Sequence, residues 1–276
     1  MSPSWRRRLG IALFPDRLVL ARANGGFRQR LEHKEILELP PAQEGRPRWQ
    51  PAVDALTDKV ATVELAHADV TLVLSNYFAH YTLVPWSEAL GGKEEELAFA
   101  RHCFARVYGA EADAWALRLS PAGPGKPRIA CAIEQALVDA LGGCMTALGN
   151  RYRSLQPHLM ASFNRWHARL GERPAWLVVA EPNLLCIALV QGGCWQSVRT
   201  LKVGRDWIEQ LPDILAREEC LIDSAADCDH VLLIAPDAPD TVAPQAGKWR
   251  FENLVPTLLP GMTAGADAPF SVALGA

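Results

Sequence analysis

The N-terminal part of the chain alternates between short apolar runs and residues that favour turns, which is typical of consecutive strands. Leu9–Phe14 and Leu18–Ala23 are apolar, and Pro15-Asp16 separates them. Asn24-Gly25-Gly26 then leads into Phe27–Leu39, in which apolar and polar residues alternate. Because Asn-Gly between β-like runs is a strong hairpin signal, the sequence predicts a meander of three strands joined by tight turns.

A helix and a further strand follow this meander. Between Val53 and Leu65 the apolar residues recur at Val53, Leu56, Val60 and Val63. This spacing places them on one face of a helix. Val70–Leu74 is then a short apolar run. The opening part of the chain therefore predicts three strands, a helix and a strand.

The middle of the chain predicts a mixture of both element types. Helices are expected at 94–108, 134–148 and 157–170, and strands at 78–84, 114–119, 129–133 and 152–155. In the first of these helices the apolar residues Leu97, Ala100, Phe104 and Val107 share one face, so we expect that face to be packed.

The opening order of elements returns after a predicted hinge at Gly171–Pro174. Strands are predicted at 176–180, 184–190 and 195–203, a helix at 205–220 and a buried strand at 231–234. Glu181-Pro182-Asn183 and Gln191-Gly192-Gly193 form the two turns between the strands, and Pro212 is a candidate break in the helix. No sequence repeat accompanies this order, so the predicted repetition is structural.

Composition and charge narrow the class of protein. The chain has 276 residues, of which 49% are hydrophobic and 21% charged, with a formal net charge of -3. This composition predicts a globular chain and removes the long-range attraction to nucleic acid that a strongly basic domain has. The seven cysteines include no pair at the spacing C-x-x-C, which argues against a disulfide framework or a zinc knuckle.

The sequence also predicts a cytoplasmic start and no membrane insertion. Arg6–Arg8 precede the apolar run Leu9–Phe14, but that run is shorter than the roughly seven to fifteen residues of a signal peptide's apolar region. Val70–Ser87 and Pro182–Val198 lack Asp, Glu, Lys and Arg. Both stretches alternate like strands and contain Asn together with Pro or Gly, so neither is predicted to span a membrane.

The duplicated order of elements resembles the actin, hexokinase and Hsp70 ATPase superfamily. Within it, the chain is most similar to the PilM proteins of type IV pili and to the cytoplasmic domain of the GspL proteins of type II secretion. The stretches that carry this resemblance are Val70–Ser75, Tyr81–Trp86, Glu94–Glu96, Trp115–Leu119 and Ala132–Glu134, followed by Tyr152–Pro157.

The resemblance implies an α/β fold of the actin-like, or ribonuclease H-like, type. Two duplicated lobes are expected, each built from a mixed sheet with a three-strand meander plus helices. The first lobe would comprise residues 1–170, with an inserted subdomain at about 77–130, and the second would comprise residues 171–276.

The turns that hold a nucleotide in this superfamily have changed in this chain. ATP-binding members place Asp-x-Gly in the two phosphate turns and Gly-Gly in the adenosine loop. The corresponding residues here are Phe14, Pro15, Asp16 and Arg17, then Glu181, Pro182 and Asn183, and finally Pro236 and Asp237. Because proline has no N–H to donate and a phenylalanine is bulky, we expect weak nucleotide binding or none, with no cofactor, bound metal or catalytic residue.

The same resemblance implies a role in assembly. We expect a non-catalytic cytoplasmic scaffold, held at the inner membrane through its partners, that captures a short peptide of a membrane-anchored pilus or secretion protein. An extended peptide would supply backbone hydrogen bonds and place alternate side chains in pockets. The residues expected to line this groove are Ser75, Tyr77, Tyr81, Arg151, Arg153 and Phe163.

Two other functions remain open at this stage. The chain would be an active ATPase or a sugar or acetate kinase if Arg17, Glu181 and Asp237 carried the cation and metal roles. Asp16 and Glu181 would then form a carboxylate pair for Mg²⁺, although a turn-forming Asp16 and a solvated or hydrogen-bonded Glu181 are favoured. The second function is nucleic-acid binding by the arginines between Arg151 and Arg173. A solvated helix face is favoured for these arginines, a partner groove comes next, and a nucleic-acid surface comes last.

Overall fold

A computed structural model describes residues 7–25, 29–61, 68–147, 151–222, 228–239, 241–244, 247–256, 258–263 and 265–274. The predicted helix beyond residue 61 and the predicted start of the third strand at Phe27 and Arg28 lie outside the described residues. Gln29 and Arg30 are described and lie before the third strand, which begins at Leu31, so the connection from Ala23 is longer than the predicted tight turn. Within the described part, the sequence pattern and the observed elements agree in most places.

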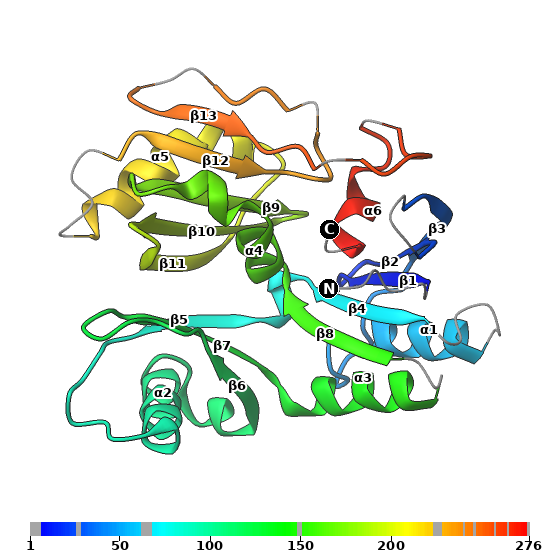
Figure 1. Ribbon diagram of the computed structural model, residues 1–276, viewed down its shortest axis with the longest axis horizontal. Helices are drawn as coiled ribbons and strands as arrows, with labels where there is room; N and C mark the ends of the chain where they lie inside the picture. Colours follow the sequence, from blue (N-terminus) through cyan, green and yellow to red (C-terminus); the bar gives the residue numbers. More distant parts are fainter. Residues whose placement is uncertain are drawn as a thin grey trace. The chain divides into compact units, whose positions relative to one another are not determined.

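The first sheet has five strands in the order β3-β2-β1-β4-β8. Its strands are β1 (Arg8–Leu13), β2 (Arg17–Ala23), β3 (Leu31–Glu38), β4 (Asp69–Leu74) and β8 (Arg151–Pro157). The meander β1–β3 is antiparallel, whereas β4 runs parallel to both β1 and β8. The helices α1 (Gln50–Ala61) and α3 (Gln135–Ala147) lie side by side on one face of this sheet (Figure 1).

The second sheet repeats this topology in the order β11-β10-β9-β12-β13. Its strands are β9 (Ala175–Glu181), β10 (Leu184–Gln191), β11 (Cys194–Lys202), β12 (His230–Ile234) and β13 (Arg250–Asn253). The meander is again antiparallel, and β12 is parallel to both β9 and β13. The repeated order of elements predicted from the sequence is thus confirmed.

Helix α5 (Trp207–Cys220) connects β11 to β12 and corrects one expectation. Pro212 lies inside this helix and does not divide it. A proline removes one backbone hydrogen bond from a helix. Leu211, Ile214 and Leu215 are all buried against the second sheet, on both sides of the proline. The packing of the two helical segments on one core outweighs the lost hydrogen bond.

The crossover from β4 to β8 contains an insert. It comprises the 3₁₀ turn η2 (Asn76–Phe78), β5 (His80–Val84), α2 (Lys93–Tyr108), the 3₁₀ helix η3 (Gly109–Ala114), β6 (Trp115–Leu119) and β7 (Arg128–Glu134). The strands form a three-stranded sheet in the order β5-β7-β6, and α2 packs on β5 and β6. The predicted strand at 78–84 therefore begins only at His80.

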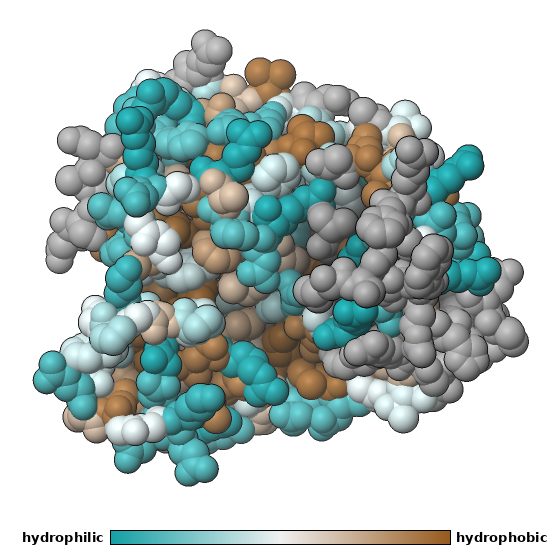
Figure 2. Space-filling model, in the orientation of Figure 1, coloured by the Kyte–Doolittle hydropathy of each residue, from teal (hydrophilic) through white to brown (hydrophobic). Residues whose placement is uncertain are grey.

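The predicted packed face of α2 is only half correct. Ala100 and Phe104 are fully buried, but Leu97 is 37% and Val107 65% exposed. A three-stranded sheet is too narrow to cover both ends of a sixteen-residue helix. Figure 2 shows hydrophilic and hydrophobic side chains interspersed at the surface over this insert, at the lower left of the view.

Contacts divide the chain into two compact units. The first consists of residues 1–78, 135–165 and 255–276, and the second of residues 79–134 and 166–254. Compact units group residues by contacts, whereas the lobes predicted from the sequence group them by repeated topology. The predicted lobe boundaries therefore stay a prediction. Helix α4 (His158–Leu170) follows β8 and contributes residues to both units.

Two C-terminal elements carry no sequence periodicity and were not predicted: the short strand β13 and the short helix α6 (Ala268–Ala273). Helix α6 packs on β1, β2 and β4 within the first unit. Its backbone comes so close to Gly10 that an added Cβ would lie 2.3 Å from the Ala273 carbonyl oxygen. Only glycine permits this approach of helix to strand.

No helix in the described part of the chain is both long and apolar enough to cross a bilayer.

Candidate functional site

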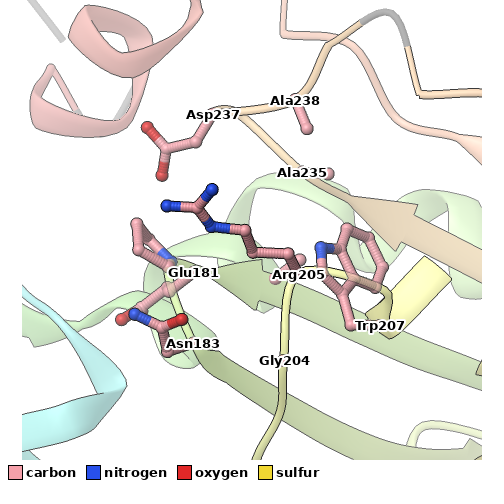
Figure 3. A pocket seen from close by; sticks show the side chains of 10 residues that line it. Glu181, Asn183, Gly204, Arg205, Trp207, Ala235, Asp237 and Ala238 are labelled. Atoms are coloured by element: carbon pink, nitrogen blue, oxygen red, sulfur yellow. The ribbon is translucent and has the colours of Figure 1, made fainter.

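A pocket of about 390 Å³ opens in the second unit, where β9 and β12 end (Figure 3). Carboxyl ends of parallel strands are a common place for ligand sites in open α/β sheets. The residues that line the pocket are Ala180, Glu181, Pro182, Asn183, Gly204, Arg205, Trp207, Ala235, Asp237 and Ala238. The structure thus brings together Glu181, Pro182 and Asn183 of the predicted second phosphate turn and Asp237 of the predicted adenosine loop, whereas Pro236 does not line the pocket.

The turn between β9 and β10 is rigid and poor in donors. Glu181 pairs with Leu184 across the hairpin, so the loop consists of Pro182 and Asn183. Asn183 has a φ of 60°, which with a preceding proline is the pattern of a type II turn. Pro182 has no N–H, and the carbonyl of Asn183 accepts a hydrogen bond from the Val203 amide at 3.1 Å. Of the two loop residues, only Asn183 therefore has a backbone N–H that could donate to a ligand.

The pocket is lined by acidic and basic side chains together, Glu181, Arg205 and Asp237. Glu181 is only 5% exposed, whereas Arg205 is exposed. In Figure 3 the Arg205 side chain extends across the pocket toward Asp237. The guanidinium of the pocket thus extends toward a carboxylate of the same pocket, which makes its charge less available to a phosphate ligand.

The first turn, between β1 and β2, is filled by its own side chains. Phe14 is 2% exposed, and its amide donates to the Arg17 carbonyl at 2.9 Å. The Arg17 guanidinium carbon lies 4.4 Å from the centroid of the Phe14 ring, and a guanidinium nitrogen lies 3.6 Å from an Asp16 carboxylate oxygen. Arg17 therefore already has an aromatic and an acidic neighbour, and Pro15 supplies no N–H.

The residues considered for catalysis by an ATPase are distributed over both units. Asp16 and Arg17 belong to the first unit, and Glu181 and Asp237 belong to the second. Within the described ranges, no group of three or more His, Cys, Asp or Glu side chains is arranged to hold a metal ion.

Three predicted partner-binding residues lie where the chain leaves β4. The Ser75 hydroxyl accepts a hydrogen bond from the Tyr77 amide at 3.0 Å, and Ser75 itself is 1% exposed. Tyr77 is half-buried. Tyr81, on β5, is 6% exposed, and burial raises the pKa of its hydroxyl well above the usual value. Of these three side chains, only Tyr77 is accessible to a partner.

The other predicted partner-binding residues come from β8 and α4. Arg153 is exposed but engaged, because its Nη2 lies 2.6 Å from Oδ2 of the buried Asp69. This ion pair fastens β8 to the start of β4. Phe163 on α4 is half-buried. The side chain of Arg151 lies outside the described part of the structure.

Sequence reasoning missed three residues at this end of the sheets. Asn76 is buried, and its Oδ1 accepts a hydrogen bond from the Leu159 amide at 2.9 Å, which caps the first turn of α4. Arg48 and Arg205 each stand two positions before a crossover helix, α1 and α5 respectively. An arginine followed closely by a tryptophan occurs at both helix starts, as Arg48-Trp49 and as Arg205 with Trp207. This repeated pair was the sequence signal that could have indicated both arginines.

Comparison with known proteins places this geometry in context. No protein-family model and no curated protein matches the chain. Among solved structures, the PilM-PilN type IV pilus biogenesis complex contains a chain that matches with a TM-score of 0.67 at 16% identity, covering 97% of this chain and 96% of that one. The cytoplasmic domain of EpsL, an inner membrane component of the type II secretion system of Vibrio cholerae, matches with a TM-score of 0.59 at 10% identity, covering 98% and 95%.

A third match identifies the fold by name. A Bacteroides thetaiotaomicron protein with an actin-like ATPase fold and unknown function matches with a TM-score of 0.52 at 10% identity, covering 84% of this chain and 82% of that one. These similarities confirm the predicted α/β, actin-like fold with its two mixed five-stranded sheets. They also confirm the resemblance to PilM and to the cytoplasmic EpsL domain.

Proposed function

We propose that the chain is a non-catalytic scaffold of a type IV pilus or type II secretion assembly, acting in the cytoplasm at the inner membrane. It would bind a short peptide of a membrane-anchored partner. Two matches that extend over almost the whole chain support this, one to a structure of PilM with PilN and one to a cytoplasmic domain of an inner membrane component.

The observation that carries the non-catalytic part is the state of the two nucleotide-facing turns. Both contain a proline, one is closed on a buried Phe14, and the other lines a pocket in which Arg205 extends toward Asp237. Phosphate binding in such folds depends on free backbone N–H groups and a positive local field. These residues therefore fit a nucleoside triphosphate poorly, and no step of catalysis is assigned to them.

The proposed peptide surface is centred on Tyr77 and Phe163, which are both half-buried. The buried Ser75 would position Tyr77 without touching the peptide, and Tyr81, which belongs to the second unit, is kept from the family resemblance. Arg153 would hold β8 in place through its ion pair with Asp69. Arg151 is the remaining partner-binding residue that the family resemblance implies.

The nucleotide part is tested by isothermal calorimetry of the full chain with Mg²⁺-ATP, with Mg²⁺-ADP as a second titrant. We expect no heat of binding. A micromolar dissociation constant would favour the alternative, an actin- or kinase-superfamily ATPase with atypical phosphate loops. Hydrolysis that is lost in Glu181→Gln would establish that alternative.

The partner part is tested with overlapping peptides from the cytoplasmic segments of single-span membrane proteins encoded beside this chain. We expect one segment to bind the wild-type chain, and Tyr77→Ala and Phe163→Ala to weaken it. Val242→Ala is the matched control, because Val242 is an 86% exposed apolar residue that belongs to the second unit, whereas Tyr77 and Phe163 belong to the first. If no segment binds, the scaffold proposal is wrong.

A further inference from the structure

The loop before α1 and the turn after β4 together form a small polar site in the first unit. Arg48 donates a hydrogen bond to the Tyr77 hydroxyl, and its guanidinium carbon lies 5.6 Å from the centroid of the Tyr77 ring. The two residues are 29 positions apart. We refer to this pair as the Arg48–Tyr77 fork.

Both halves of the fork are held by preorganised backbone. The Gln50 amide donates to the Pro47 carbonyl at 3.0 Å, which closes a turn around Arg48, and the next residue, Trp49, is 6% exposed. On the other side, the Phe78 amide donates to the Ser75 carbonyl at 3.0 Å and closes η2 around Tyr77. Recognition by a fixed side chain costs less conformational entropy than recognition by a mobile one.

The fork has an uncompensated positive charge. Arg48 is exposed, and no described Asp or Glu carboxylate lies within ion-pair distance of its guanidinium. A guanidinium carries five N–H donors in a planar arrangement that matches a carboxylate. The hydrogen bond to Tyr77 uses one nitrogen, so further donors point to solvent. The ring of Tyr77 stabilises the cation without neutralising it.

We propose that the Arg48–Tyr77 fork binds the carboxylate of an Asp or Glu side chain in the partner's peptide. The inference rests on the proposed function and gives the peptide a chemical requirement, an acidic residue at the position that meets Tyr77. Charge-assisted hydrogen bonds to a guanidinium are short, directional and about twice as strong as neutral ones. The fork therefore sets the register of the bound peptide as well as its affinity.

Two fluorescently labelled probes, hexaglutamate and hexaglutamine, test the chemistry without knowledge of the partner. We expect the full chain to bind hexaglutamate in preference to hexaglutamine. Loss of one charge-assisted contact in Arg48→Ala should weaken hexaglutamate binding about tenfold. Arg48→Lys, which keeps the charge but not the planar donors, should fall between the two.

Arg46→Ala is the matched control, because Arg46 is an exposed arginine of the same loop. We expect it to leave hexaglutamate binding nearly unchanged. Equal losses in Arg46→Ala and Arg48→Ala would show general attraction to a basic loop and overturn the proposal. Unchanged binding in Arg48→Ala would overturn it as well. Thermal unfolding of each variant verifies that Trp49 still anchors the loop.

The natural peptide found among the neighbouring proteins separates this inference from the scaffold proposal. Replacing its acidic residue by the amide should weaken binding to the wild-type chain but not to Arg48→Ala. If the peptide binds both proteins equally well, the fork is not its site, although the scaffold proposal stands. If hexaglutamate requires Arg48 and no partner peptide binds, the fork is an anion site on a protein with another function.

Discussion

The two five-stranded sheets each place an arginine two residues before the crossover helix, but the group that the arginine meets differs. Arg48 contacts Tyr77, the third residue after β4, whereas Arg205 extends toward Asp237, the third residue after β12 (Figure 3). The tyrosine has no negative charge to compensate the guanidinium of Arg48. The carboxylate of Asp237, in contrast, has a charge opposite to that of Arg205. One topology thus places an arginine beside a tyrosine hydroxyl in the first unit and an arginine that extends toward a carboxylate in the second.

The crossovers differ as well. Between β4 and β8 the first sheet contains a whole insert with its own sheet, whereas β12 and β13 are joined by residues 235–249, whose described part contains no helix or strand. The first sheet is also closed by α6, whose backbone touches Gly10. The duplicated framework is conserved in topology while each copy is completed by different elements.

The largest expected effect concerns the way the first sheet is closed. In Gly10→Val the new side chain would meet the Ala273 backbone, which cannot move aside as a flexible side chain can. Overpacking of this kind costs about 3 kcal/mol of unfolding free energy. Urea denaturation of the full chain measures it. Gly142→Ala, at a position with open space inside α3, should instead be neutral or slightly stabilising. Similar stabilities for both variants would show that α6 does not depend on Gly10.

The next effect tests the difference between Arg48 and Arg205 directly. Tyr77→Asp gives the first unit the carboxylate that the second unit has, so the Arg48 charge becomes internally paired. Binding of labelled hexaglutamate should fall about tenfold, as for a lost charge-assisted contact. Tyr77→Phe removes only the hydroxyl and keeps the ring under the guanidinium, so it should lose much less. If Tyr77→Asp binds as well as the wild-type chain, the two arginines do not differ in the proposed way.

The free energy of unfolding of the insert between β4 and β8 should respond to mild acid. His80 stacks on Trp115 with ring centroids 4.0 Å apart. Burial lowers the pKa of His80 below its ordinary 6.5, although the carboxylates of Glu134 and Glu111 partly oppose this. Because the unfolded chain takes up the proton more readily, the contribution of His80 is complete above about pH 6.5 and is lost as the pH falls through the lower pKa of the folded state.

The measurement is the free energy of unfolding between pH 8 and pH 5, compared with that of His80→Asn. A histidine with a lowered pKa loses about 1.4 kcal/mol for each unit of the shift as the pH falls. His80→Asn should lack the loss of unfolding free energy that protonation of His80 causes, and should keep the pH dependence that other groups cause. Parallel pH profiles for the two proteins would mean that the His80–Trp115 stack tolerates the charged imidazole.

Much of this framework was predictable from the sequence, because it is encoded in local pattern. The strands around Asn24-Gly25 and Gln191-Gly192-Gly193, and the repeated order of elements, follow from alternation and turn residues. The helix α6 did not, since its six residues are fixed by tertiary contact with β1 and show no periodicity. The exposure of Val107 was missed because the spacing of apolar residues does not reveal how wide the covering sheet is.

The candidate sites also differ in whether local sequence or tertiary contact determines them. The altered turns at Pro15 and Pro182 are visible in the sequence, because a missing N–H is a property of a single residue. The Arg48–Tyr77 fork was not visible, since its two members are 29 positions apart and meet only once the crossover is folded. Tyr77 was predicted through the family resemblance, but Arg48, which contributes the positive charge of the fork, was not.

The smallest expected effect comes from removing the carboxylate in the second unit. In Asp237→Ala, Arg205 would lose the group toward which it extends, and the pocket would keep the carboxylate of Glu181. We expect hexaglutamate to gain a weak second site, with an affinity increase of about threefold or less, because a partly solvated charge pair is worth about 0.2–1 kcal/mol. The double variant Asp237→Ala/Arg205→Ala should return to the wild-type value. A gain that persists in the double variant would arise from net charge alone, and Arg205 would then not be the counterpart of Arg48.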